Sequence, residues 1–203
     1  MLRIDHCDNT EEGLTLKKMA DTRTKLVSTL RDQHMIDEET FALFLKKNNA
    51  VTRYASCTEE EFILSKRQYD NLELSYKHLY AHSRVNLSNH ILLKYLDFVQ
   101  LQEPTRFKTL VLNSQGIADE VWDRKVDTEA KFLEMIFNNT YQSSNGVLVI
   151  DMYTKFHPCE SCLGVMEQFI EEMKKYNVNA ILNVYYEIKP SKINRLRKGQ
   201  TVL

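Results

Sequence analysis

The chain has 203 residues, of which 43% are hydrophobic and 27% charged, a composition typical of folded globular proteins and not of disordered ones. Its 27 Lys and Arg side chains balance 28 Asp and Glu, so no overall positive field would hold the protein on nucleic acid or on an anionic membrane. No apolar run approaches the ~20 residues that span a bilayer, and the acids near the N-terminus do not fit a signal peptide. We therefore expect a soluble protein of the cytoplasm.

The first third of the chain has a helical pattern. Apolar residues recur among charged ones over residues 11–31, and a second helix is expected to begin near Asp37. The run Thr58 to Glu61 fits a capping box, in which the Glu side chain bonds back to the cap backbone, and it predicts a third helix. We expect residues 1–65 to form a helical N-terminal extension and residues 66–203 to form the main domain.

The last 80 residues have the clearest pattern. Asp127 is expected to begin a helix, residues 147–153 to form a buried strand, Pro158 to begin a second helix, and residues 180–186 to form another strand. Strands that alternate with helices predict an α/β layer with neighbouring parallel strands. Before this region, we expect a strand over residues 72–83 and a helix over residues 88–101.

Two short motifs carry candidate chemistry, Asp127-Thr128-Glu129 at one helix start and Pro158-Cys159-Glu160-Ser161-Cys162 at the next. Two thiolates at i and i+3 can bind one Zn²⁺, and the helix N-terminus favours the thiolate form. A catalytic zinc needs a third protein ligand and an open position for water, and Asp127 can supply an oxygen. Glu129 could then take a proton from that water and pass it to a leaving amine.

Other interpretations of these residues stay open on the sequence alone. A strand followed by Cys-x-x-Cys and a helix also describes thioredoxin-like dithiol oxidoreductases. A structural zinc site would need a fourth ligand, such as His157 or Asp127. Asp127 could also simply cap its helix, while Cys7 and Cys57 are expected to be structural thiols.

The order and spacing of these motifs resemble those of the zinc nucleobase deaminases, whose signature is His-x-Glu followed by Pro-Cys-x-x-Cys. The chain is most similar to the bacterial polymorphic-toxin branch of the cytidine deaminase-like superfamily, over roughly residues 70 to 190. The stretches that carry this resemblance are Tyr80 to Ser83, Arg124 to Lys131, and Tyr153-Thr154 leading into the cysteine motif. Asp127 stands where the wider superfamily has His or Cys, and the resemblance makes Asp a feature of the toxin branch.

The resemblance implies an α/β fold, a cytidine deaminase-like three-layer α/β/α sandwich around a mixed sheet of about five strands. It implies one zinc ion held by Asp127, Cys159 and Cys162, with Glu129 as the catalytic proton carrier. The implied reaction is hydrolytic deamination of a nucleobase, cytosine ahead of adenine, within single-stranded or flipped DNA or RNA or in a free nucleoside. A toxin of this kind would act in a bacterial cytoplasm, its own or a target cell's, and an immunity protein would cover its pocket.

Several polar residues around these motifs are candidates for substrate binding. Each lies within or beside a stretch that carries the resemblance, or at a turn near it. They are His82, Ser83, Asn113, Tyr153, His157 and Ser161. A basic C-terminal cluster from Lys189 to Lys198 could hold phosphates of a nucleic acid. A deaminase fold that only binds nucleic acid or a partner is the remaining alternative.

Overall fold

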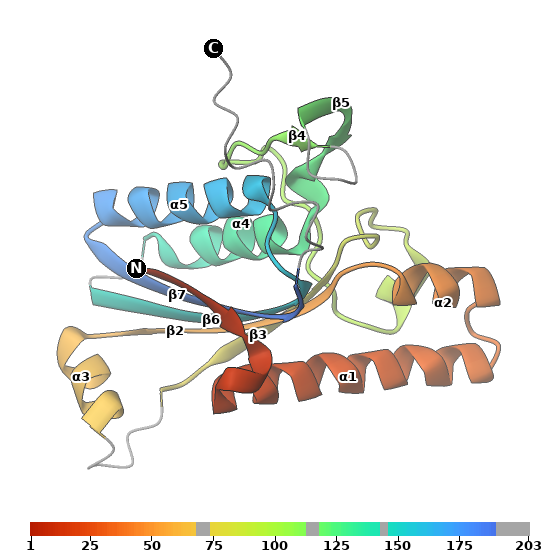
Figure 1. The fold of residues 1–203 in the computed structure, drawn as a ribbon, viewed down its shortest axis with the longest axis horizontal. Helices are drawn as coiled ribbons and strands as arrows, with labels where there is room; N and C mark the ends of the chain where they lie inside the picture. The colour runs from red at the N-terminus through yellow and green to blue at the C-terminus, as the bar shows by residue number, and fades with distance from the viewer. Residues whose placement is uncertain (68–73, 113–117, 143–145, 190–203) are drawn as a thin grey trace.

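The computed structural model of the protein is an α/β/α sandwich around a five-stranded mixed sheet (Figure 1). It describes residues 1–67, 74–112, 118–142 and 146–189. The strand order is β1-β7-β6-β2-β3, in which β1, β7 and β6 are parallel and β2 is antiparallel to both of its neighbours. The strands of this sheet are β1 (Leu2–His6), β2 (Asn49–Cys57), β3 (Lys77–His82), β6 (Gly146–Phe156) and β7 (Val178–Ile188). The expected fold class is confirmed.

Helices cover both faces of this sheet. Helices α4 and α5 lie together on one face and α1 lies along the other, as Figure 1 shows. The α-helices are α1 (Glu11–Asp32), α2 (Glu38–Leu45), α3 (Glu59–Arg67), α4 (Thr128–Thr140) and α5 (Glu160–Lys175). A second, two-stranded sheet consists of β4 (Val111–Leu112) and β5 (Ala118–Asp123). The short 3-10 helices are η1 (Cys7–Asn9), η2 (Ile91–Lys94) and η3 (Arg124–Val126). None of the helices described is both long and apolar enough to cross a bilayer.

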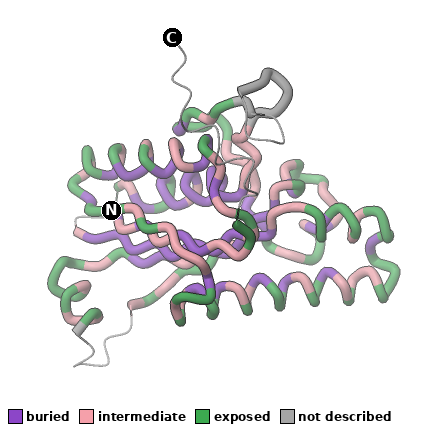
Figure 2. The backbone as a smooth tube through the Cα atoms, viewed as in Figure 1, coloured by how far each residue is buried: buried purple, intermediate pink, exposed green. Residues whose placement is uncertain are grey.

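Strand β6 runs through the middle of the buried core (Figure 2). Its residues Leu148, Ile150 and Met152 belong to the apolar cluster that packs under α4 and α5. Tyr153 instead joins a second cluster, together with Leu16 of α1. This alternation follows from the two-residue period of a strand, and it sends every second side chain of β6 toward α4.

Local sequence signals account for several element boundaries. The Thr58 Oγ1 atom accepts from the Glu61 backbone N–H at 3.1 Å, and a Glu61 carboxylate oxygen accepts from the Thr58 N–H at 2.8 Å, so the expected capping box is present. Asp37 caps α2 by accepting from the Thr40 N–H at 2.7 Å. Asn177, at a φ of 58°, makes the turn between α5 and β7 in the left-handed region that Asn tolerates.

Two expectations for the first half of the chain need correction. Residues 1–65 are not only helical, because they also contain β1 and β2, and β2 lies between β3 and β6 in the sheet. Residues 88–101 hold only the 3-10 helix η2, since the Val99 N–H bonds to the Tyr80 carbonyl at 2.7 Å and draws this segment alongside β3. The proposed division at residue 66 therefore has no counterpart in the strand order.

Candidate active site

Asp127 stands at the junction of η3 and α4, where its backbone caps the helix while its side chain makes no capping hydrogen bond. The carboxylate Oδ2 lies instead 3.4 Å from the Cys162 Sγ and 3.7 Å from the Cys159 Sγ. An aspartate that served only as a helix cap would accept from a backbone N–H of the first turn. The side chain of Asp127 is therefore turned toward the two sulfurs.

The two sulfurs come from the first turn of α5. Cys159 is the N-cap residue, and its Sγ accepts from the Cys162 N–H at 3.4 Å and lies 3.3 Å from the Cys162 Sγ. Both cysteines are free thiols. Two sulfurs and one oxygen around a tetrahedral zinc would lie about 3.6–3.8 Å apart, given ordinary bond lengths. The observed separations lie within about half an ångström of these values, so the three residues fit a zinc ion.

The pKa values of Cys162 and Asp127 are both raised. A hydrogen bond to Cys159, and then burial, raise the pKa of the Cys162 thiol well above its ordinary value. Burial also raises the pKa of Asp127, although the Arg124 guanidinium, whose Nη1 lies 3.6 Å from Oδ2, opposes this shift. Burial disfavours the charged form of an acid, and a bound cation would favour it.

Glu129 is the second residue of α4 and is buried, with 3% of its surface exposed. The Thr128 hydroxyl lies 2.8 Å from Oε2, and the Thr154 hydroxyl lies 3.2 Å from Oε1. Burial, followed by the nearby charge of Asp127, raises the pKa of Glu129 to about 7. A carboxyl group with such a pKa can both accept and return a proton near neutral pH.

Comparison with known proteins assigns these residues to a family. A model of the BURPS668_1122 family of deaminases, a toxin-deaminase family, matches residues 61–187 of the chain. The chain belongs to this family. No curated protein and no solved structure matches it. The matched segment contains the whole constellation of Asp127, Glu129, Cys159 and Cys162, and it leaves out β1, α1, α2 and β2.

His82 of the deaminase was a candidate for substrate binding, but the structure places it in the core. Its side chain is fully buried and stacks on Phe44 at 4.3 Å between ring centroids. One ring nitrogen bonds to the Phe44 carbonyl at 3.0 Å, and the other accepts from the Arg84 N–H at 3.2 Å. Burial lowers the pKa of His82 to about 3. Both ring nitrogens are thus used within the protein.

The hydroxyls of Tyr153 and Ser161 also form hydrogen bonds within the protein. Tyr153 lies on the α1 face of the sheet, where its hydroxyl donates to Glu187 at 2.8 Å. Ser161 is buried between the two cysteines, and its Oγ accepts from the Leu110 N–H at 2.9 Å. This bond ties the approach to β4 to the start of α5, which is a structural task.

The remaining candidates lie near the site or outside the described residues. His157 is half-buried beside Tyr186, and its backbone N–H bonds to the Ile188 carbonyl at 3.1 Å. Ser83 is half-buried, and its N–H donates to the Asn48 carbonyl at 3.1 Å. Asn113 and the part of the basic cluster beyond Lys189 lie outside the described residues.

Three polar residues that the sequence analysis did not single out surround this site. Thr154 and Asn48 form hydrogen bonds around Glu129. Lys131 is fully buried, and its Nζ donates to the carbonyls of His82 and Val85 at 2.8 and 2.9 Å, which ties α4 to the segment after β3. Burial lowers the pKa of Lys131 to about 7. A lysine within the apolar face of an expected helix is a pattern that could have identified Lys131 from the sequence. No local pattern marks Asn48.

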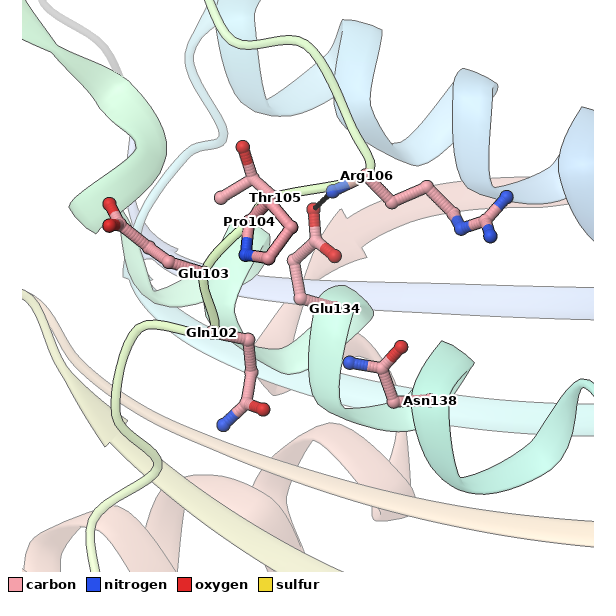
Figure 3. A pocket seen from close by; sticks show the side chains of 7 residues that line it. All are labelled: Gln102, Glu103, Pro104, Thr105, Arg106, Glu134 and Asn138. Atoms are coloured by element: carbon pink, nitrogen blue, oxygen red, sulfur yellow. Dashed lines mark hydrogen bonds between the residues drawn. The ribbon is translucent and has the colours of Figure 1, made fainter.

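A hollow of about 380 Å³ lies beside α4, between Glu134 and the segment around Pro104, and Figure 3 shows it from close by. There one Glu134 oxygen accepts the N–H groups of Arg106 and Phe107, both at 2.8 Å. The hollow contains neither the two cysteines nor Asp127 or Glu129. Its polar groups hold a loop against the helix, so the candidate chemistry is located elsewhere. The residues that line it are Gln102, Glu103, Pro104, Thr105, Arg106, Glu134 and Asn138.

Proposed function

We propose that this deaminase removes the exocyclic amine of a nucleobase by zinc-dependent hydrolysis, within single-stranded or flipped DNA or RNA. Family membership supports a hydrolytic deaminase in general. The observation that carries the finer proposal is the convergence of Asp127 with Cys159 and Cys162, next to a buried glutamate. We propose cytosine ahead of adenine as the target base, because the chain resembles the cytidine deaminase-like superfamily.

Asp127, Cys159 and Cys162 are the residues that would hold the zinc. When bound, zinc supplies a Lewis acid that makes water a usable nucleophile near neutral pH. Three anionic ligands leave a net charge of about −1 around a divalent ion. Arg124, 3.6 Å from the Asp127 carboxylate, offsets that charge and orients the oxygen.

Glu129 would carry the protons of the reaction. Its carboxylate takes one proton from the attacking water, so that the water oxygen can form a bond to the ring carbon that bears the amine. Glu129 then returns a proton to the ring nitrogen, and a second proton transfer from the new hydroxyl to the amine allows the carbon–nitrogen bond to break. Ammonia leaves and a carbonyl group remains, with no change of oxidation state.

A polymeric substrate would have to be held locally, because the chain has a net charge of only −1. The exposed residues Lys46 and Arg84 support such a contact. They lie close in sequence to Asn48 and Ser83. The Ser83 N–H donates to the Asn48 carbonyl at 3.1 Å, and the Asn48 side chain bonds to two threonines that contact Glu129. A base within a duplex would have to leave the stack to reach Glu129.

As a member of a toxin-deaminase family, the chain is proposed to act in the cytoplasm of a bacterial target cell. A cell that makes such an enzyme needs protection from it. We therefore propose an immunity protein that covers the surface around Cys159 and blocks access of a base to the site.

The proposal is tested by expressing the chain in a repair-deficient bacterial host and sequencing both genome and transcriptome. C-to-T changes would identify cytosine as the base and A-to-G changes adenine, while their presence in DNA or only in RNA would identify the polymer. E129Q should abolish the changes and retain zinc, whereas the matched variant C57S, which alters a cysteine remote from the motif, should keep them. A zinc-loaded wild-type protein that causes no changes and converts no base of a broad panel would instead be a non-catalytic binding module.

A further inference from the structure

Asn48 lies directly before β2, in the part of the chain that the family model does not match. Its side chain joins three segments around the buried glutamate. The Nδ2 atom donates to Thr128 Oγ1 and to Thr154 Oγ1, both at 2.7 Å, and the Oδ1 atom accepts from the Lys155 N–H at 2.9 Å.

The Lys155 backbone fixes which way the Asn48 amide points. A backbone N–H can only donate, so the amide atom facing it must be the carbonyl oxygen. The NH₂ group, which can only donate, therefore faces the two threonine hydroxyls. Its two hydrogens match the two Oγ1 atoms at 2.7 Å, one for each.

This orientation decides where the hydroxyl protons go. A hydroxyl has a single proton, and an oxygen that accepts from Asn48 keeps that proton for another partner. For Thr128 the partner is Glu129 Oε2 at 2.8 Å. For Thr154 it is Glu129 Oε1 at 3.2 Å, with the Phe156 carbonyl as an alternative acceptor at the same distance. The Thr128 hydroxyl thus donates to Glu129 Oε2, and the Thr154 hydroxyl lies within hydrogen-bond distance of Oε1.

We propose that Asn48 is a positioning residue, which directs the hydroxyls of Thr128 and Thr154 toward Glu129 and so holds its carboxylate in one orientation for proton transfer. The inference rests on the proposed function, because it assigns Asn48 to the reaction that Glu129 would carry. A carboxylate oxygen can accept more than one hydrogen bond, so Glu129 keeps the capacity to face a water molecule. Fixing a reactive group by hydrogen bonds from its supporting residues is a general requirement of catalytic sites.

The sharpest test is N48D, which keeps the shape of the side chain but replaces the NH₂ donor by an acceptor. One Asp oxygen can still accept from the Lys155 N–H, while the other draws the hydroxyl protons away from Glu129. We expect kcat to fall at least about tenfold, since small misplacements of catalytic groups can cost up to about a hundredfold. KM should change less than about threefold, and zinc content should remain at one equivalent. N179D adds the same charge at an exposed position of β7 and should retain wild-type kcat.

A measurement without turnover separates this inference from the proposed function. Neutron diffraction from deuterated crystals should place the Thr128 deuteron toward Glu129 in the wild type and toward residue 48 in N48D. Deuterons that point the same way in both proteins would overturn the role of Asn48, as would an N48D enzyme with unchanged kcat or with lost zinc. If the wild type converts no base, the proposed function fails, and the deuteron positions alone decide whether Asn48 orients the hydroxyls.

Discussion

Tyr153 and Thr154 are adjacent on β6, and their hydroxyls lie on opposite faces of the sheet. The Tyr153 hydroxyl donates to Glu187 at 2.8 Å within the cluster under α1, whereas the Thr154 hydroxyl lies 3.2 Å from Glu129. One strand thus contributes to two separate environments. The face that it shares with α4 is the one connected to the candidate chemistry.

This relationship makes opposite predictions for two matched variants. T154V keeps the volume of the side chain but removes a hydroxyl that contacts Glu129 and Asn48, so kcat should fall about tenfold with zinc retained. Y153F removes the bond to Glu187 and should lower the free energy of unfolding by about 1 kcal/mol without changing kcat. Steady-state kinetics and urea titration measure these effects. The reverse pattern would show that Tyr153, and not Thr154, serves the site.

Zinc binding should release protons and depend on both motifs. Because the pKa of the Cys162 thiol is raised well above its ordinary value, this group holds a proton at pH 7 that a metal must displace. Affinity should therefore increase with pH. Calorimetry in buffers of different ionisation enthalpy measures the number of protons released, which we expect to be about one or more. Heat that does not depend on the buffer would contradict this expectation.

The ligands themselves are tested by elemental analysis. C162S should lose most of the zinc, since three ligands are already the minimum for a catalytic site. C57S is the matched control. Cys57 is partly buried and lies at the end of β2, where its Sγ is 3.7 Å from the Val147 carbonyl. Equal zinc contents in the two variants would exclude Cys162 as a ligand.

The sequence could predict the parts of the fold whose signals are local. The capping box at Thr58, the cap at Asp37, and the strands and helices around α4 and α5 all agree with the structure. The constellation of Asp127, Cys159 and Cys162 followed from the types and spacing of its residues. The caps, strands and helices depend on neighbours within a few positions, whereas Asp127 lies 32 and 35 positions before the two cysteines and was joined to them by motif order and by the family resemblance.

Other features depended on contacts that sequence patterns do not reveal. Strand β2 is buried on both faces, so it lacks the alternation that marks a half-exposed strand. Motif similarity made His82 a candidate for substrate binding, but a core position was equally open, and the structure packs its ring against Phe44, 38 residues earlier. Tyr153 was expected to line the pocket, but it points to the opposite face of β6 from Thr154, because neighbouring residues of a strand point to opposite faces. Asn48 reaches Thr154 across 106 positions, which no local pattern predicts.

The strand order also makes a prediction about the N-terminal segment. A domain boundary at residue 66 predicts that residues 66–203 fold alone, whereas the sheet predicts that they do not. Removing residues 1–65 would delete β1 from the edge beside β7 and β2 from between β6 and β3. Unpaired central strands leave buried backbone groups without partners, so we expect an unfolded or aggregated fragment. Circular dichroism and a cooperative urea transition in the fragment would instead support the boundary at residue 66.

The buried histidine predicts how stability changes with pH. The pKa of His82 is about 3 in the folded protein, below the value of about 6.5 for an exposed imidazole, because burial disfavours the charged ring. The unfolded chain therefore takes up a proton that the folded one does not as pH falls below about 6.5. The stabilising contribution of His82 is complete above that pH and is lost at about 1.4 kcal/mol per pH unit on acidification.

Comparing wild type with H82Q cancels the titration of other groups. The difference in free energy of unfolding should shrink by about 2.3 kcal/mol between pH 6.5 and 4.5, as measured by urea titration. Parallel curves would mean that His82 becomes charged in the folded protein, which its two internal hydrogen bonds and its stacking on Phe44 argue against.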